Sequence, residues 1–333
     1  KGLVKRAITQ VITPGTVLDD QVLKAGRSNF LVAIHAVKDR FALALLDVST
    51  ADFRLTDLRD RGALENELHR LQPAECLLPA ELHDAWERDG FPDAPAKIAW
   101  TPLESWLFDY EMAHEALCRH FEVASLDGFG CRGLESAVCA AGAVFSYAQK
   151  NLRQDAGHIT SLQVYQHDSY MVLDRISQRN LELVEPIFAD AREATLLSVM
   201  DQTVTPMGGR LLREWILRPL RAIAAIDERL DAVEWLVDDP LLLSELVEAL
   251  GAVRDLERTI VRVNVGSANA RDLQVLERGL AAVPGLRALL GEDSPALVGK
   301  LAGDLRDLPE LTALIARAIV DEPPLAITER GVP

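Results

Sequence analysis

Aromatic residues are scarce in this sequence: Phe, Trp and Tyr together make up 5% of its 333 residues. Hydrophobic residues still reach 49%, so a core must be built from Leu, Val, Ala and Ile, a composition that favours helices. No apolar run approaches the ~18 residues that suggest a membrane span, and no signal peptide is recognised. We therefore expect a cytoplasmic protein without a membrane segment.

Metal-binding and disulfide patterns are also missing. The four cysteines form no Cys-x-x-Cys pair, and the seven histidines do not cluster with them. Zinc sites need paired ligands at such short spacing. We predict no metal site, and we predict buried, reduced thiols at Cys76, Cys118, Cys131 and Cys139.

Cationic residues are few relative to acidic ones. Lys and Arg total 35 against 51 Asp and Glu, which gives a formal net charge of −16. Because phosphate contacts need clustered Lys and Arg, this balance argues against an autonomous nucleic-acid-binding protein. A nucleotide-binding loop is missing too, since Gly299-Lys300 is followed by Leu301 and Ser294 stands where the loop's first glycine belongs. We expect no cofactor in this chain.

The first half of the sequence carries a mixed pattern. Apolar runs over 30–37 and 41–48, followed by alternation over 52–55, predict three antiparallel strands. Helical spacing then alternates with short apolar runs that predict further strands. The predicted helices cover 58–71, 103–121 and 134–151, and the predicted strands cover 75–78 and 97–100. This half is therefore an α/β domain, and turn chemistry at 13–16 predicts a boundary before it.

From Asp174 onward the pattern is helix after helix, which predicts an all-α domain. One helical stripe holds Leu230, Val233 and Val237. The charge series at 254–258 predicts a solvated helix face whose i,i+4 pairs contribute ~0.3–0.5 kcal/mol each. The stretch 159–173 between the two halves predicts a link between domains, with a hairpin turn at 166–169 as one reading.

The segment 177–220 is the most informative part of the chain. Thr205 can cap a helix, Pro206 suits its first position, and Pro219 ends it. Glycines at 208 and 209 are costly in a helix, so the pair predicts another backbone passing close by. The apolar stripe of this helix, which we predict as its structural core, consists of Leu211, Leu212, Trp215 and Ile216.

The run as a whole resembles a known family. Arg-Asn-Leu-Glu-Leu at 179–183, Asp-Gln-Thr-Val-Thr-Pro-Met-Gly-Gly at 201–209 and Arg-Pro-Leu at 218–220 resemble the start of the core (lever) domain of the MutS family of DNA mismatch-repair proteins. Val-Ile-Thr-Pro-Gly-Thr at 11–16 resembles the family's junction between mismatch-binding and connector domains. Leu-Asp-Gly-Phe-Gly at 126–130 resembles the end of the connector, and Asp-Glu-Pro-Pro at 321–324 resembles the point just before the clamp. The resemblance covers essentially the whole chain.

This resemblance implies a division into three parts. Residues 1–13 would be a remnant of the mismatch-binding domain and linker, and 14–158 a connector domain with a ribonuclease H-like fold. Residues 159–333 would be the first part of a helical core/lever domain, truncated before the clamp. The chain begins at Lys1 without a Met, and both ends fall in mid-pattern, so we expect a fragment of a longer protein.

The resemblance also implies a function. The parent would be a homodimeric ATPase that uses ATP and Mg to act on mismatched double-stranded DNA, and the connector would offer a surface to MutL. Neither the family's ATPase domain nor its Phe-x-Glu mismatch probe occurs in this sequence. We expect a monomeric, non-catalytic fragment that relays structural change and binds DNA weakly or not at all by itself.

Two alternatives remain open at this point. Asp47 and Asp52 lie on adjacent predicted strands, and nucleases of ribonuclease H-like fold hold two metal ions between several carboxylates. Their odd separation would put them on opposite faces of one continuous strand, and no further carboxylate partner is identifiable, so we predict no catalytic residue. The other alternative is a free-standing helical scaffold.

Overall fold

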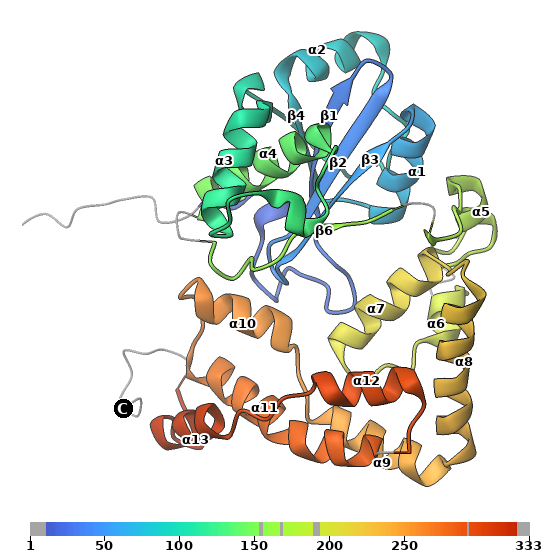
Figure 1. Ribbon diagram of the computed structural model, residues 1–333, viewed down its shortest axis with the longest axis vertical. Coiled ribbons are helices and arrows are strands. Elements are labelled where there is room, and N and C mark those ends of the chain that lie inside the picture. The colour runs from blue at the N-terminus through green and yellow to red at the C-terminus, as the bar shows by residue number, and fades with distance from the viewer. Residues whose placement is uncertain (1–10, 153–155, 167–168, 189–193, 292, 325–333) are drawn as a thin grey trace, which may run out of the picture. The chain divides into compact units, whose positions relative to one another are not determined.

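The chain folds into two compact units. The computed structural model describes residues 11–152, 156–166, 169–188, 194–291 and 293–324. One unit, here called the sheet unit, consists of Lys1–Lys24 and Ser28–Gln166. The other, the helical unit, consists of Ala25–Arg27 and His167–Pro333 (Figure 1). The chain therefore passes from one unit to the other three times.

The sheet unit is built on a six-stranded mixed sheet. Its strands are β1 (Leu31–Val37), β2 (Arg40–Asp47), β3 (Asp52–Leu58), β4 (Glu75–Pro79), β5 (Ala99–Leu103) and β6 (Gln163–Val164). Their order is β5-β4-β1-β2-β3-β6. The pairs β1–β2 and β2–β3 are antiparallel, which confirms the predicted meander, whereas β4 runs parallel to β1 and β5 parallel to β4. The carboxyl ends of β1, β4 and β5 consequently meet at one edge.

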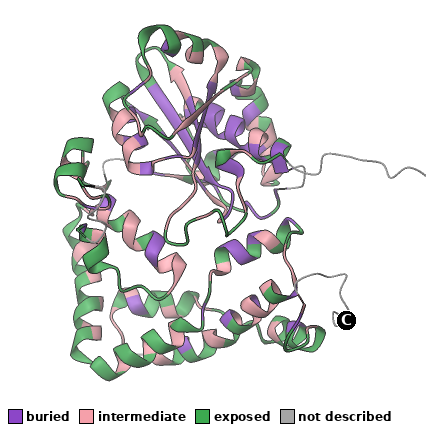
Figure 2. Cartoon of the chain, turned by 180° about the vertical axis from the view of Figure 1, so that it is seen from behind, coloured by how far each residue is buried: buried purple, intermediate pink, exposed green. Residues whose placement is uncertain are grey.

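Helices cover both faces of this sheet, which is why β1 and β2 are apolar almost throughout rather than alternating. On one face lie α3 (Tyr110–His120) and α4 (Glu135–Leu152), and on the other α1 (Arg61–Leu71) and α2 (Ala80–Asp89). Short 3-10 helices are η1 (Pro14–Thr16), η2 (Ser105–Phe108) and η3 (Leu126–Phe129). Figure 2 shows the buried residues of this unit concentrated in the sheet and in α4.

Several sequence predictions for the sheet unit need correction. The helix predicted over 103–121 begins only at Tyr110, because the Asp109 side chain caps it by accepting from the amides of Glu111 and Met112. Helix α2 was not predicted, since its polar sequence offers only Leu82 and Trp86 as apolar residues one turn apart.

The stretch 159–173, predicted as a link between domains with a hairpin as one reading, contains β6, which pairs in parallel with β3. The boundary between the two units falls within this stretch, after Gln166. His167 and Asp168 of the predicted turn lie outside the described residues. The four cysteines are free thiols, as predicted, although Cys118 is only half-buried. Burial raises the pKa of Cys131 and of Cys139 to about 11, so both stay protonated near neutral pH.

The helical unit contains nine α-helices among its described residues. They are α5 (Arg175–Asn180), α6 (Leu196–Met200), α7 (Pro206–Leu217), α8 (Ile223–Asp238), α9 (Pro240–Gly251), α10 (Leu256–Asn264), α11 (Ala270–Leu290), α12 (Ala296–Asp304) and α13 (Pro309–Ala318). Asp239, Asp255 and Asn269 cap α9, α10 and α11 by accepting from backbone amides of the first turn. Within the described residues no helix combines the length and the apolar character needed to cross a membrane.

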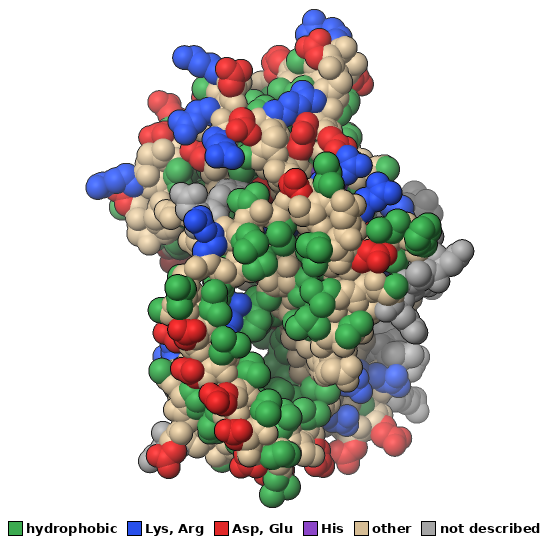
Figure 3. Space-filling model, turned by 90° about the vertical axis from the view of Figure 1, so that its right-hand side faces the viewer, with side chains coloured by type: hydrophobic (Ala, Val, Ile, Leu, Met, Phe, Trp, Pro, Cys, Tyr) green, Lys and Arg blue, Asp and Glu red, His purple; other side chains and the backbone are tan. Residues whose placement is uncertain are grey.

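Among the described residues, the helical unit buries fewer hydrophobic side chains than the sheet unit does. The stripe formed by Leu230, Val233 and Val237 on α8 faces outward, and all three side chains are exposed. Residues on the other sides of α8, among them Ala232, Trp235 and Leu236, are only half-buried. Figure 3 shows hydrophobic side chains exposed at the surface, with charged side chains among them.

Candidate functional site

Helix α7 forms where the sequence predicts it. The Thr205 hydroxyl oxygen accepts from the Gly208 amide at 3.1 Å, and Pro206 occupies the first helical position. The helix ends at Leu217, after which the Arg218 amide donates to the Glu214 carbonyl at 2.9 Å and Pro219 prevents continuation. The capping and stop signals are therefore confirmed.

Only part of the predicted core stripe of α7 is even half-buried. Leu211 is 48% exposed and Trp215 is 40% exposed, whereas Leu212 and Ile216 are half-buried. The prediction that this stripe forms the structural core is therefore wrong for Leu211 and Trp215. The reason is that the buried side of the helix carries Gly209, Arg210 and Leu217 instead. The Trp215 ring is covered by a cation: the Arg229 guanidinium lies 3.6 Å from its centroid.

A buried ionic network occupies the inner side of α7. Arg210 donates to both carboxylate oxygens of Asp255, at 2.7 and 2.9 Å, and to the carboxylate of Glu257 at 2.6 Å. Arg258, itself 3% exposed, lies beside Asp255. A fork-shaped guanidinium with two parallel bonds to one carboxylate is a strong and geometrically specific pair.

The charges in this network hold one another in the ionised form. Burial alone disfavours the charged form of Arg210, but the bonds to Asp255 and Glu257 outweigh it and raise the pKa of Arg210. Burial likewise tends to raise the pKa of Asp255, and the bonds from Arg210 outweigh this effect and lower it. Removing one partner would leave the other buried and charged, which is far costlier than the pair itself.

The same arginines hold the segment 25–27, the short piece of the helical unit that precedes the first strand of the sheet. Arg210 donates to the Ala25 carbonyl at 2.9 Å, and Arg258 donates to the Arg27 carbonyl at 2.9 Å. A Cβ placed on Gly209 would lie 3.6 Å from the Cα of Gly26, so the prediction of a passing backbone is confirmed there. We call this arrangement the linker clamp: Arg210, Asp255, Glu257, Arg258 and residues 25–27.

The sequence does not reveal the linker clamp, because the charge series at 254–258 predicts a solvated helix face. That prediction is wrong for Asp255 and Arg258, which are largely buried. One signal was available: Asp255 stands directly before the apolar run that starts α10, the position of a capping residue, and it accepts from the Arg258 amide at 3.2 Å. The pairing with Arg210, 45 residues earlier, has no local signature.

The candidate nuclease carboxylates are already engaged. Asp47 is fully buried and accepts from the Asn29 amide at 2.8 Å, the Ser49 amide at 2.9 Å and the Ser49 hydroxyl at 2.6 Å. Asp52 accepts from Arg54 at 2.7 Å. The two residues are paired across the β2–β3 hairpin, so they share a face, and the expectation of opposite faces was wrong. Asp47 organises a turn, and nothing at this place supports a metal-dependent nuclease.

A different carboxylate of the sheet unit, that of Glu75, accepts four hydrogen bonds. Glu75, at the start of β4, is 1% exposed. One of its oxygens accepts from the Thr13 hydroxyl at 2.5 Å and the Gly15 amide at 3.0 Å. The other accepts from the Thr101 hydroxyl at 2.8 Å and the Tyr147 hydroxyl at 2.7 Å. These four bonds join the turn at 13–16 to β4, β5 and α4, and we call them the Glu75 hub.

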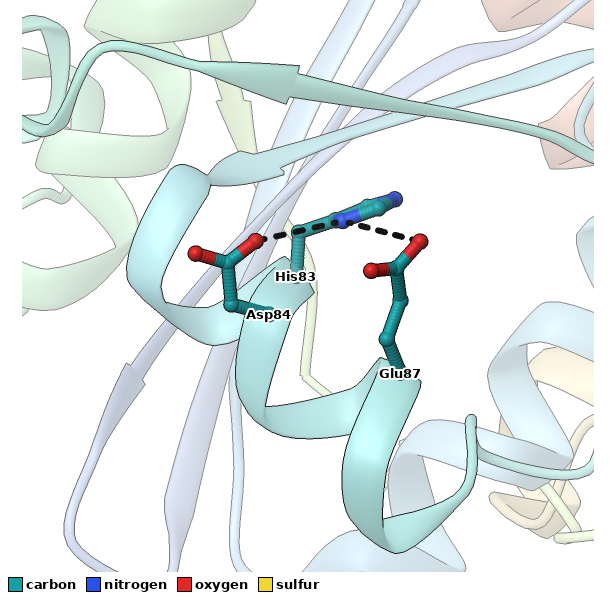
Figure 4. Close-up of side chains that lie close together, drawn as sticks. All are labelled: His83, Asp84 and Glu87. Carbon is teal, nitrogen blue, oxygen red and sulfur yellow. Dashed lines mark ion pairs between the residues drawn. The ribbon is translucent and has the colours of Figure 1, made fainter.

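One group on α2 could hold a metal ion: His83, Asp84 and Glu87 (Figure 4). The Nδ1 atom of His83 lies 3.9 Å from a carboxylate oxygen of each acid. The Asp84 and Glu87 side chains are 75% and 62% exposed, and such exposed acidic groups are common without an ion. The prediction of no metal site stays a prediction.

Comparison with known proteins relates both units to one family. The model for MutS domain II matches residues 29–160, and the model for MutS domain III matches residues 177–333. The DNA mismatch repair protein MutS of Symbiobacterium thermophilum is 41% identical over all of this chain, and that match covers 38% of the relative. The proteins of the same name from Methanococcoides burtonii and Syntrophobacter fumaroxidans are 35% and 38% identical over the whole chain, covering 38% and 37% of their lengths.

One match falls in each unit, domain II in the sheet unit and domain III in the helical unit. The chain belongs to the MutS family, with matches to its domains II and III. It spans less than two fifths of the length of these relatives.

Proposed function

We propose that this chain is the connector and the first part of the core/lever domain of a MutS-like mismatch-recognition ATPase. Its role is to relay structural change between the mismatch-binding and ATPase domains of that protein. The consecutive matches to domains II and III support this proposal. A relay needs stiff elements that move as bodies between discrete arrangements, and packed helices meet that requirement.

The linker clamp is the observation that carries the proposal. The chain leaves the sheet unit at Lys24, enters the helical unit for three residues, and returns at Ser28. The first and last of those three residues, Ala25 and Arg27, are held through their backbone carbonyls by Arg210 and Arg258. Because Arg210 belongs to α7, a displacement of α7 pulls on the covalent entry to the sheet unit.

We further infer a ribonuclease H-like topology for the sheet unit. The supporting features are the β1–β2–β3 meander and the two following strands, β4 and β5, which extend the sheet on the other side of β1 in parallel. The topology carries no nuclease activity here, because a fold does not determine a function and Asp47 is engaged in a turn.

The chain itself performs no reaction in this proposal. ATP and Mg would bind the parent protein elsewhere, mismatched double-stranded DNA would be contacted through the parent, and the parent would be a homodimer. The 333-residue chain alone would be a monomer located in the cytoplasm. Leu212 and Ile216 would support α7 from its half-buried side.

Binding measurements on the isolated chain test this reading. We expect no heat of binding with ATP and Mg in titration calorimetry. In gel shifts at moderate salt, we expect no preference for a mismatched duplex over a matched one, because the chain carries 16 more acidic than basic charges. Saturable ATP binding, or a mismatch preference, would contradict the proposal.

We also propose that the connector offers the surface to which MutL binds. The family resemblance motivates this proposal. Cross-linking of the chain to MutL, followed by mass spectrometry, is expected to place the linked positions within 28–166. Links confined to the helical unit would rule it out.

A further inference from the structure

A pocket opens at the edge of the sheet where β1, β4 and β5 end. It has a volume of about 670 Å³ and is bounded by the last residues of β1, the first turns of α2, η2 and the start of α3. In α/β sheets with parallel strands, ligands bind beyond the carboxyl ends of those strands, where neighbouring connections diverge. Here β1 continues into an antiparallel hairpin, while β4 and β5 lead into α2 and η2, so the connections diverge at this place.

Part of the lining of this strand-end pocket is apolar. This part includes Leu82, Trp106, Phe108 and Met112. Trp106 is 55% exposed and Met112 51% exposed, although both are large apolar side chains. The Trp106 indole N–H donates to the Glu104 carboxylate, which fixes the ring. Exposed Trp and Met side chains are typical of the centres of protein–protein interfaces.

The charged groups that line the pocket are all of one sign. Glu81 and Asp109 contribute carboxylates, and none of the lining residues is Lys or Arg. His35 also lines the pocket, stacked on Phe108 with 5.9 Å between ring centroids. Burial lowers the pKa of His35, which keeps it neutral at pH 7. A phosphate or another anion would therefore be repelled, and a cationic neighbour would be attracted.

We propose that the strand-end pocket docks a peptide segment of another protein, with a large apolar side chain inserted between Leu82 and Met112 and Lys or Arg beside it. Cations flanking the anchor meet Glu81 and Asp109, and an Arg can also stack on Trp106. Because Trp106 and Met112 line the pocket and are also more than half exposed, their apolar surface exceeds what a small molecule in the cavity would cover, so a peptide fits it better. The inference does not depend on the proposed relay.

Fluorescence anisotropy on the 333-residue chain tests this proposal. The probe is a short fluorescein-labelled peptide in which Leu and Phe alternate with Lys. Two further peptides replace every Lys with Glu, or every Leu and Phe with Ser. We expect saturable binding of the first peptide only, weakened at least tenfold by Trp106→Ala and by Met112→Lys, and severalfold by Glu81→Gln.

Matched variants separate docking from general attraction to an acidic protein. Glu87→Gln removes one carboxylate from the same helix outside the pocket, and Trp215→Ala removes an exposed indole from the helical unit. Both are expected to bind the peptide as the unmodified chain does, and circular dichroism verifies that every variant is folded. Equal weakening by Glu87→Gln and Glu81→Gln, or binding of the Ser-substituted peptide, would overturn the proposal. The proposal would also be overturned if Met112→Lys increased the affinity of the chain for a single-stranded oligonucleotide and left its affinity for the peptide unchanged.

Discussion

The Glu75 hub makes a graded prediction about stability. Replacing Glu75 by Ala removes an acceptor for one buried backbone amide and for three half-buried hydroxyls, two of threonine and one of tyrosine. Hydrogen bonds to charged groups contribute about 1.5–3 kcal/mol each, and an amide left buried without a partner costs about 1–3 kcal/mol. Since hydroxyls can turn to other acceptors, we expect Glu75→Ala to lower the free energy of unfolding of the sheet unit by about 3–5 kcal/mol.

Milder changes at the same hub should cost less. In Glu75→Gln, the amide oxygen can serve Thr13 and Gly15 while its NH2 group donates to the hydroxyls of Thr101 and Tyr147. The number of bonds is then preserved and only their charge assistance is lost, about 1–2 kcal/mol. Tyr147→Phe removes a single bond and should cost about 1–1.5 kcal/mol. Burial raises the pKa of Tyr147, and the hydrogen bond to the Glu75 carboxylate adds a smaller effect, so that the pKa reaches about 12.

Urea unfolding followed by tryptophan fluorescence and far-UV circular dichroism measures this series. Trp86 and Trp100 report on the sheet unit, because both pack in its core. Glu87→Gln, at an exposed carboxylate, is the control and should change the free energy of unfolding by less than about 0.5 kcal/mol. A cost for Glu75→Ala no greater than that of Tyr147→Phe would refute the reasoning.

Three further predictions follow from packing and ionisation. Trp215→Ala should cost about 1–2 kcal/mol by urea unfolding, rather than the ~3–5 of a core tryptophan, because the ring is 40% exposed; a full core cost would mean that the ring is buried in solution. Gly142→Ala should lower the free energy of unfolding by about 1–3 kcal/mol, because a Cβ there would overlap Ala113 where α3 crosses α4. Gly285→Ala should raise it by about 0.5–1 kcal/mol, because the added Cβ contacts no other atom and alanine favours the helix α11. Burial lowers the pKa of His35 and of His158, so the unfolded chain binds more protons than the folded one at acidic pH. Stability should therefore be complete above the unfolded pKa of about 6.5 and fall as the pH drops below it, a slope that the double variant His35→Gln/His158→Gln should reduce.

The elements that could be predicted from sequence are those with strong local signals. The β1–β2–β3 meander follows from continuous apolar runs separated by a polar turn, and α7 follows from Thr205, Pro206 and Pro219. Helix α2 could not be predicted, because most of its residues are polar and only Leu82 and Trp86 form an apolar pair one turn apart. Strand β6 is two residues long, and its pairing with β3 depends on the tertiary fold.

The candidate site was harder to predict, and for a physical reason. Periodicity identifies which residues share a helix face, but it does not say which face turns inward. On α7 the inner face carries Arg210 because two acids beyond α9, Asp255 and Glu257, neutralise it. Similarly, the spacing of Leu230, Val233 and Val237 is correct for a helix, yet the stripe faces outward. Contacts of long sequence separation decide these cases, and the Glu75 hub, which joins Thr13 to β4, is another.

The relay account is tested most directly by breaking the linker clamp in the full-length protein that contains this chain. We predict that Arg210→Met leaves the basal rate of ATP hydrolysis and the affinity for a mismatched duplex within about twofold, while the stimulation of hydrolysis by the mismatch falls at least about fivefold, a typical coupling factor. Arg229→Met, which removes the cation over Trp215 outside the clamp, serves as the control. Undiminished stimulation in a folded Arg210→Met protein, or an equal loss in Arg229→Met, would contradict the account.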